Sequence, residues 1–269
     1  MTFLNVLLSM CLGAFVGKYI AMLTYYLPQI LLEGCDKGRE PRDIFKWFFQ
    51  KPFCWSCKKP LPRAGGVPIL GYFSLKGECP HCKFSIRRMF ILELLVAFIF
   101  GTLTLFSSFT PTLIFVLIVT CLLICCFITD LEYSLLPDQL TLALVWVGLL
   151  GSLLPVYLSP QEAIIGAVGG YGIFWIINEI YRFFRQRDGM FPGDFKLNAG
   201  IGACIGFKML LPVLVIALLL LIVITMIKIL SSKESNEGSF LHKEVCYGCY
   251  LSVVAVTTLF LMFFGAFNP

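Results

Sequence analysis

Charged residues and histidines are scarce in this chain, and each shortage excludes a class of protein. Only 14% of the 269 residues are charged, whereas 58% are hydrophobic and the mean hydropathy is +0.87. A chain of this length could not bury so much apolar surface in one soluble core. Histidine occurs only as His81 and His242, so no Ser–His or Cys–His catalytic pair presents itself. The composition is that of a polytopic membrane protein.

Apolar runs long enough to cross a bilayer recur along the whole chain. A helix needs about 20 residues to span a hydrocarbon core of about 30 Å. An additional Gly-rich run at 195–207 is shorter, and it predicts either a closely packed short helix or a re-entrant segment. The sequence therefore predicts an all-α polytopic membrane protein of about eight transmembrane helices, with seven as the alternative. The longer runs cover residues 3–24, 90–107, 113–130, 139–157, 162–181, 209–230 and 246–265.

Lysine and arginine are distributed unevenly between the loops that join these runs. Twelve lie in 33–88, four in 182–196 and three in 228–243, whereas the loops at 107–112 and 157–161 have none. Cytoplasmic loops carry the excess of basic residues in membrane proteins. The large loop is therefore expected in the cytosol, with both termini outside. Membrane topology explains the net charge of +5 better than nucleic-acid binding does.

Four cysteines in the large loop have the spacing of a metal site. Two Cys-x2-Cys pairs are separated by 21 residues and flanked by basic side chains. Paired thiolates of this kind give tetrahedral ligation that suits Zn²⁺, and a reducing cytosol disfavours disulfides. We expect a small, structural zinc-ribbon-like loop, with a redox pair or unligated thiols as the alternative. The ligands would be Cys54, Cys57, Cys79 and Cys82, with His81 a solvated neighbour.

The remaining cysteines predict packing rather than chemistry. Cys121, Cys125 and Cys126 lie in one apolar run, where cysteine behaves as a small core residue. Cys246 and Cys249 have the same Cys-x2-Cys spacing, but they begin an apolar run and no second pair accompanies them. We interpret both groups as packing residues.

Two aspartates stand where the chain meets the bilayer. Asp130 closes one apolar run and Asp194 precedes another, 64 residues later. Each lies on the expected cytosolic side, and carboxylates at a hydrocarbon boundary are costly and usually functional. Gly193 would let the chain approach closely or adopt positive φ just before Asp194. Taken singly, either aspartate could be a helix cap or a partner for a cation such as Lys196.

Taken together, the aspartates predict an acid–base pair. One ionised carboxylate would take a proton from water while its protonated partner donates to a peptide carbonyl. A carboxylate-using transporter and a zinc-binding membrane scaffold are alternatives, but the first does not need the cysteines and the second leaves the aspartates unused. For Asp138 we expect capping of a helix that starts near Gln139. Acidic residues near the surface (Glu132, Asp138, Asp188) could meet a basic substrate or be solvated.

These motifs together resemble the type IV prepilin peptidases, also called leader peptidase/N-methyltransferases, a family of GxGD-type membrane aspartic proteases. The resemblance covers essentially the whole chain. It divides the chain into a first span with its flank (1–32), a cytosolic loop with the zinc site (33–89) and a membrane peptidase core (90–269). The matching segments are the four cysteines with their spacing, Arg87 to Leu95, Asp130-x6-Pro137-Asp138-x-Leu140-Thr141-Leu142 with Trp146, and Gly189-Met190-x2-Gly193-Asp194-Phe195-Lys196-Leu197.

The resemblance implies a reaction, cofactors and a location. Asp130 and Asp194 would be the catalytic pair, cleaving the short basic leader of prepilins or pseudopilins after a glycine. N-methylation of the new N-terminus from S-adenosylmethionine would follow, in the bacterial cytoplasmic (inner) membrane with the active site facing the cytosol. Three stretches depart from the family pattern. Phe191 replaces the first glycine of GxGD, Gly13-Ala-Phe-Val-Gly17 stands for Gly-Ser-Phe-Leu-Asn, and Gly65-Gly66 stands for Asp-Asn.

Overall fold

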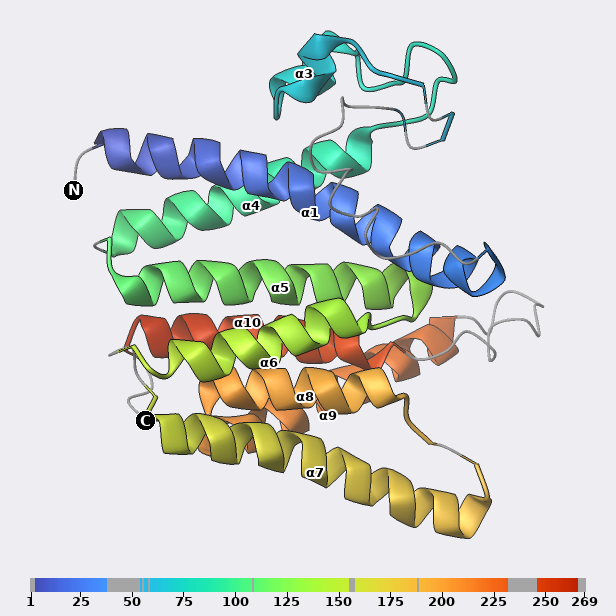
Figure 1. The fold of residues 1–269 in the computed structure, drawn as a ribbon, viewed down its shortest axis with the longest axis vertical. Coiled ribbons are helices and arrows are strands. Elements are labelled where there is room, and N and C mark those ends of the chain that lie inside the picture. Colours follow the sequence, from blue (N-terminus) through green and yellow to red (C-terminus); the bar gives the residue numbers. More distant parts are fainter. Residues whose placement is uncertain are drawn as a thin grey trace. The chain divides into compact units, whose positions relative to one another are not determined.

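The computed structural model describes residues 3–37, 54, 56–57, 59–107, 109–154, 158–187, 189–231 and 246–265 (Figure 1). The chain divides into two compact units, Met1–Leu113 and Ile114–Pro269. Within the described ranges the regular structure is helical, and an isolated antiparallel bridge joins Glu78 to Ser85 in the loop. This agrees with the all-α prediction.

The first unit is built on two long helices that pack closely along each other. They are α1 (Phe3–Lys37) and α4 (Arg87–Phe106), with η1 (Arg63–Gly66) and α3 (Leu70–Ser74) in the loop between them. Glycines on α1 permit the approach, because a methyl group at Gly13 or Gly17 would lie 2.8 Å from Phe100 or Glu93 on α4. Small residues at such crossings are typical of membrane helices. Gly17, a departure from the family pattern, therefore has a packing reason.

The described residues of the second unit form six helices. Helix α8 lies between α6 and α7 in Figure 1 and contacts both of them, as well as α9 and α10. Nearly all its residues from Phe195 onward are buried, so it forms the centre of the unit. The helices are α5 (Pro111–Tyr133), α6 (Asp138–Gly151), α7 (Pro160–Arg185), α8 (Pro192–Ile205), α9 (Phe207–Ser231) and α10 (Tyr247–Phe263).

A glycine contact holds α7 against α8. A methyl group on Gly166 would overlap the carbonyl of Gly202, and one on Gly202 would overlap the carbonyl of Gly166. One turn further along α7, a methyl group on Gly170 would lie 2.5 Å from the Asn198 carbonyl oxygen. The Gly-rich segment predicted at 195–207 is thus a short, closely packed helix, the first of the two expected alternatives.

All eight predicted apolar segments are helical, but they differ in their capacity to cross a membrane. Among the described residues, five helices are long and apolar enough to span a bilayer: α1, α4, α5, α7 and α9. Helices α6 and α10 are apolar but shorter, and α8 is as short as α6, at 14 residues each, and less apolar. The count of eight spans is therefore not confirmed, although each helix lies where the sequence predicts one.

Candidate active site

Asp130 lies near the C-terminal end of α5 and is held by the first turn of α10. Its side chain is 6% exposed, and its Oδ2 accepts a hydrogen bond of 2.8 Å from the backbone N–H of Cys249. Gly248 makes this approach possible, because a methyl group there would lie 2.9 Å from the same oxygen. The first N–H groups of a helix have no partner within the helix and carry partial positive charge. The start of α10 is therefore a favourable place for the carboxylate of Asp130.

Asp194 occupies the first turn of α8. Its Oδ2 accepts a hydrogen bond of 3.3 Å from the backbone N–H of Phe191, the residue that caps this helix, so the expectation of a capping contact also holds. Asn198 donates from Nδ2 to the Asp194 carbonyl at 2.8 Å. Gly193 does not have a positive φ. It lets the backbone before Asp194 pack closely against Leu136, because a methyl group at Gly193 would lie 2.8 Å from Cβ of Leu136.

The two carboxyl groups lie within electrostatic reach of each other. Burial first, and then the negative charge of Asp130, raise the pKa of Asp194 to about 6. Tyr247, the first residue of α10, interacts electrostatically with Asp194, while the next two residues approach Asp130. The start of α10 therefore contacts Asp130 and lies within electrostatic range of Asp194. The sequence placed the two aspartates together only through the predicted membrane topology.

Asp138 does not cap a helix, contrary to the prediction. Helix α6 begins at Asp138 itself, Pro137 occupies the capping position, and that cap has no side-chain hydrogen bond. The Asp138 carboxylate instead accepts a 2.7 Å hydrogen bond from Nζ of Lys196 on α8. Lys196, considered above as a partner for Asp194, thus pairs with Asp138. This ion pair joins the starts of α6 and α8.

Phe191 does not distort the turn before Asp194. Its backbone is ordinary extended chain, with φ −82° and ψ 147°, so the position does not need the conformational freedom of glycine. The side chain is 61% exposed and leaves the helix start intact. The departure from GxGD therefore alters a side chain rather than the backbone path.

Sequence reasoning missed Asn178, which anchors the segment before Asp194. This buried residue of α7 accepts hydrogen bonds at its Oδ1 from the backbone N–H groups of Gly189 and Met190, at 2.9 and 3.1 Å. Buried amides of this kind often fix loops, because unpaired backbone groups are costly. An asparagine within a predicted apolar segment was the available signal.

The four loop cysteines come together in the first unit. Their sulfur atoms all lie within 4.8 Å of one another and could hold a metal ion. The Cys54–Cys82 and Cys57–Cys79 sulfur distances are 3.5 and 3.9 Å. The backbone N–H of Phe84 lowers the pKa of the Cys82 thiol to about 7. His81 is exposed and contributes only its backbone N–H, which donates to Sγ of Cys79 at 3.5 Å.

A second polar cluster in the first unit joins Lys18, which directly follows one departure from the family pattern, to Gly65 and Gly66, which form another. Lys18 on α1 donates from Nζ to the carbonyls of Gly65 and Gly66. Glu93 on α4, 3% exposed, accepts a 2.6 Å hydrogen bond from the backbone N–H of Ile69 and lies in the field of the Lys18 charge. The cluster connects the loop to both helices, through contacts that the sequence alone did not predict.

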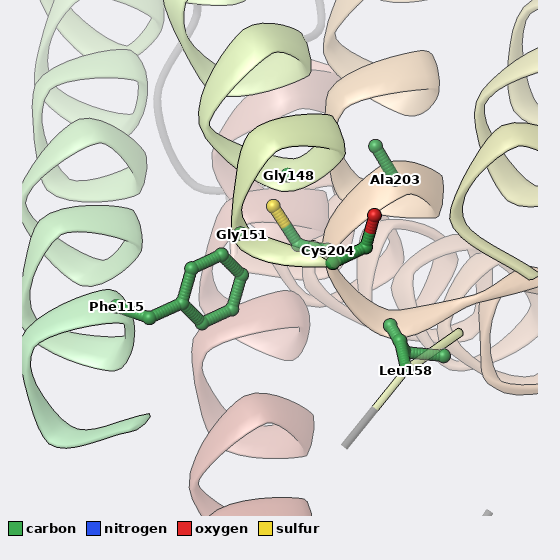
Figure 2. Close-up of a pocket in the computed structure, with 7 residues that line it drawn as sticks. Phe115, Gly148, Gly151, Leu158, Ala203 and Cys204 are labelled. Atoms are coloured by element: carbon green, nitrogen blue, oxygen red, sulfur yellow. The ribbon is translucent and has the colours of Figure 1, made fainter. Parts of the chain in front are cut away.

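A small pocket in the second unit lies away from the aspartates. Figure 2 shows Phe115 of α5, Gly148 and Gly151 of α6 and Cys204 of α8 around it. Phe115 precedes Asp130 by 15 residues on one helix, which corresponds to about 22 Å along the axis. Its lining has no acid or base, so the pocket is not part of the candidate site.

Two of the acidic residues predicted near the surface remain to be placed. Glu132 is exposed, and Asp188 lies outside the described residues. The histidine His242 also lies outside them.

The fold and site define a helical membrane protein in which two carboxyl groups lie at helix ends, within electrostatic range of each other. Comparison with protein families gives two matches: residues 117–226 match the type IV leader peptidase family, and residues 11–107 match the bacterial peptidase A24 N-terminal domain. The chain belongs to the type IV leader peptidase family. Together with the five described helices that are long and apolar enough to span a bilayer, this makes it a multi-pass protein of the inner membrane.

Curated relatives cover most of the chain. The prepilin leader peptidase/N-methyltransferase of Neisseria gonorrhoeae is 33% identical over 220 residues, covering 77% of this chain and 76% of the relative. Proteins of the same description from Aeromonas salmonicida and Legionella pneumophila are 32% and 29% identical, covering 88% and 91% of this chain and 84% and 87% of the relatives. A comparison with solved structures gave no significant match.

Proposed function

We propose that this protein is an aspartic endopeptidase that removes the basic leader from prepilins or pseudopilins at the cytosolic face of the inner membrane. The observation that carries the proposal is that Asp130, held by the start of α10, lies within electrostatic range of Asp194. The relatives are named for prepilin leader cleavage, which supports the substrate class. The transporter and scaffold alternatives receive no support from the family matches.

The proposed reaction is hydrolysis of one peptide bond by acid–base catalysis. An ionised carboxylate takes a proton from water, and the resulting hydroxide attacks the peptide carbonyl carbon. The protonated partner donates its proton to the carbonyl oxygen. When the C–N bond of the tetrahedral intermediate breaks, a proton passes to the leaving amine, and the pair returns to one proton shared between two carboxylates.

The surroundings of the two aspartates suggest which one is ionised. Backbone N–H donation from the start of α10 stabilises the charged form of Asp130. Asp194, whose pKa is raised to about 6, holds its proton more readily. We therefore assign Asp130 as the base that activates water and Asp194 as the acid that protonates the carbonyl oxygen.

The charge distribution supports a cytosolic site. Asp130 ends one apolar run and Asp194 precedes another, and the basic loops assign both of these ends to the cytosol. A prepilin presents a basic leader followed by an apolar helix, so its scissile bond would lie at that surface. We divide the chain by function into the first span (1–32), the zinc loop (33–89) and the peptidase core (90–269).

Zn²⁺ is the metal that we propose for the four cysteines. Zn–S bonds of about 2.3 Å in a regular tetrahedron give sulfur–sulfur edges of about 3.8 Å. The Cys54–Cys82 and Cys57–Cys79 distances of 3.5 and 3.9 Å fit that geometry. Four protein ligands would leave no open position, so the ion would stabilise the loop rather than act on substrate.

N-methylation of the new N-terminus is the second proposed activity, because the relatives are named for it. S-adenosylmethionine would supply the methyl group. Among the described residues, no cluster is recognisable as a site for this cofactor, so we assign none to its binding.

Mass spectrometry of a co-expressed prepilin tests both activities at once. We expect the mature pilin to begin directly after the leader glycine and to carry one added methyl group. A prepilin whose glycine before the cleavage site is replaced by a bulkier residue is the matched control and should stay uncut. An intact leader on the unaltered prepilin, with the enzyme present in the membrane, would contradict the proposal.

A further inference from the structure

Cys246 and Cys249 do more than pack, because their sulfur atoms converge on Asp130. The two thiol sulfurs and a carboxylate oxygen of Asp130 all lie within 4.8 Å of one another. The two cysteines come from the start of α10, where Cys246 occupies the position just before the helix without a side-chain capping hydrogen bond, and Asp130 comes from α5. Neither cysteine forms a disulfide in the described part of the chain.

The surroundings of this cluster are polar and partly accessible. The Ser134 hydroxyl lies 3.4 Å from Sγ of Cys246, and Cys249 donates from Sγ to the Phe127 carbonyl at 3.4 Å. Cys249 is 3% exposed, whereas Cys246 is only half-buried, so an ion could enter past Cys246. Outer hydrogen bonds of this kind orient ligands in metal sites.

The donor set selects for one class of ion. Two sulfurs favour thiophilic cations such as Zn²⁺ over Mg²⁺ or Ca²⁺, which prefer oxygen ligands alone. Three protein ligands leave a fourth tetrahedral position for water, as in open zinc sites. We propose that Cys246, Cys249 and Asp130 form a second metal site, which binds a Zn²⁺-class cation and inhibits the peptidase when occupied.

Inhibition follows from the atoms involved. On binding, each thiol releases its proton to solvent, and the cation gains two thiolate ligands and one carboxylate ligand. The Asp130 carboxylate then donates its electrons to the metal and no longer accepts a proton from water. The inhibitory part rests on the proposed function, in which Asp130 is the base, whereas the binding part does not depend on it.

Metal counting tests the binding part. The purified full chain is dialysed against Zn²⁺ in a non-chelating reductant, and the metal bound per chain is measured. We expect Cys246→Ser to bind one Zn²⁺ fewer than the unaltered protein, and Cys121→Ser, a half-buried cysteine of α5 outside the cluster, to bind the same number. Equal stoichiometry in the unaltered protein and Cys246→Ser would overturn the site, whatever the loop cysteines bind.

Titration of Zn²⁺ against prepilin cleavage tests the inhibitory part. Cleavage at each concentration is divided by that variant's own metal-free rate, so no basal rate is assumed. The half-inhibitory concentration should rise at least about tenfold in Cys246→Ser and stay unchanged in Cys121→Ser. An equal value in Cys246→Ser, or binding without inhibition, would overturn this part. If the unaltered protein cleaves nothing, the proposed function fails while the metal count still decides the site.

Discussion

The carboxylate of Asp130 accepts a 2.8 Å hydrogen bond from the backbone N–H of Cys249, a residue 119 positions away. This contact brings the end of α5 to the first turn of α10, whose first residue interacts electrostatically with Asp194. The helix start therefore holds one aspartate and neighbours the other. Such an arrangement keeps two carboxyl groups in unlike surroundings, as an acid–base pair requires.

Gly248 should be intolerant of a side chain. In Gly248→Ala the new methyl group would lie 2.9 Å from Oδ2 of Asp130 and displace the carboxylate. Because small misplacements of catalytic groups are costly, we expect cleavage to fall about 100-fold. Gly172→Ala is the control, since a methyl group there meets nothing within 4 Å. Initial rates of prepilin cleavage by both variants decide the matter, and equal rates would contradict the account.

Asp194 should make stability depend on pH. Its pKa of about 6 lies above the value of 3.8 for an unperturbed aspartate, so the folded state binds more protons between these values. Stability therefore falls as pH rises from about 4 to about 6. Asp194→Asn removes this pH dependence. The change that the substitution causes in the free energy of unfolding should therefore be more favourable at pH 7 than at pH 4, by up to about 3 kcal/mol. Thermal unfolding in detergent at both values measures the difference, and a pH-independent difference would refute it.

The packing of α7 against α8 should be destabilised when a glycine at the contact is replaced by alanine. Gly166→Ala places a methyl group against the Gly202 carbonyl, a backbone atom that cannot move aside cheaply. We expect a loss of stability of about 1–3 kcal/mol, typical of overpacking. Gly172→Ala on the same helix should change stability by less than about 0.5 kcal/mol. A matching drop in unfolding temperature for both variants would show that the contact is not specific.

The cysteine loop should depend on its metal. Chelation, or Cys57→Ser, would remove a ligand set that organises a segment with only a small apolar cluster of its own, formed around Cys54, Leu61 and Cys79. Limited proteolysis should then cut within the loop much faster than in the untreated protein. Cys11→Ser, an exposed cysteine of α1, should leave the cutting rate unchanged. If chelation removes the metal without accelerating cutting, the proposed structural function of zinc is wrong.

The helices, and the positions of Asp130 and Asp194 at helix ends, could be predicted from sequence because hydropathy and charge report directly on a bilayer. The contacts at the start of α10 could not, since Cys246 and Cys249 differ little in sequence from packing cysteines. Only the tertiary arrangement brings them to Asp130. Asp138 was assigned a local capping contact, yet a lysine 58 residues away supplied its partner. Sequence patterns predict contacts between neighbouring residues, whereas this site is formed by residues far apart in the chain.

The central claim is that Asp130 and Asp194 together perform the hydrolysis. The most direct test is cleavage of a prepilin by purified Asp130→Asn and Asp194→Asn, with Asp138→Asn as a neighbouring aspartate outside the proposed pair. Mass spectrometry of the intact pilin shows whether the leader has been removed. The account predicts that each of the first two variants loses at least about 100-fold in rate while remaining folded and membrane-inserted, and that Asp138→Asn keeps cleaving. Retained cleavage in Asp130→Asn or Asp194→Asn would contradict it.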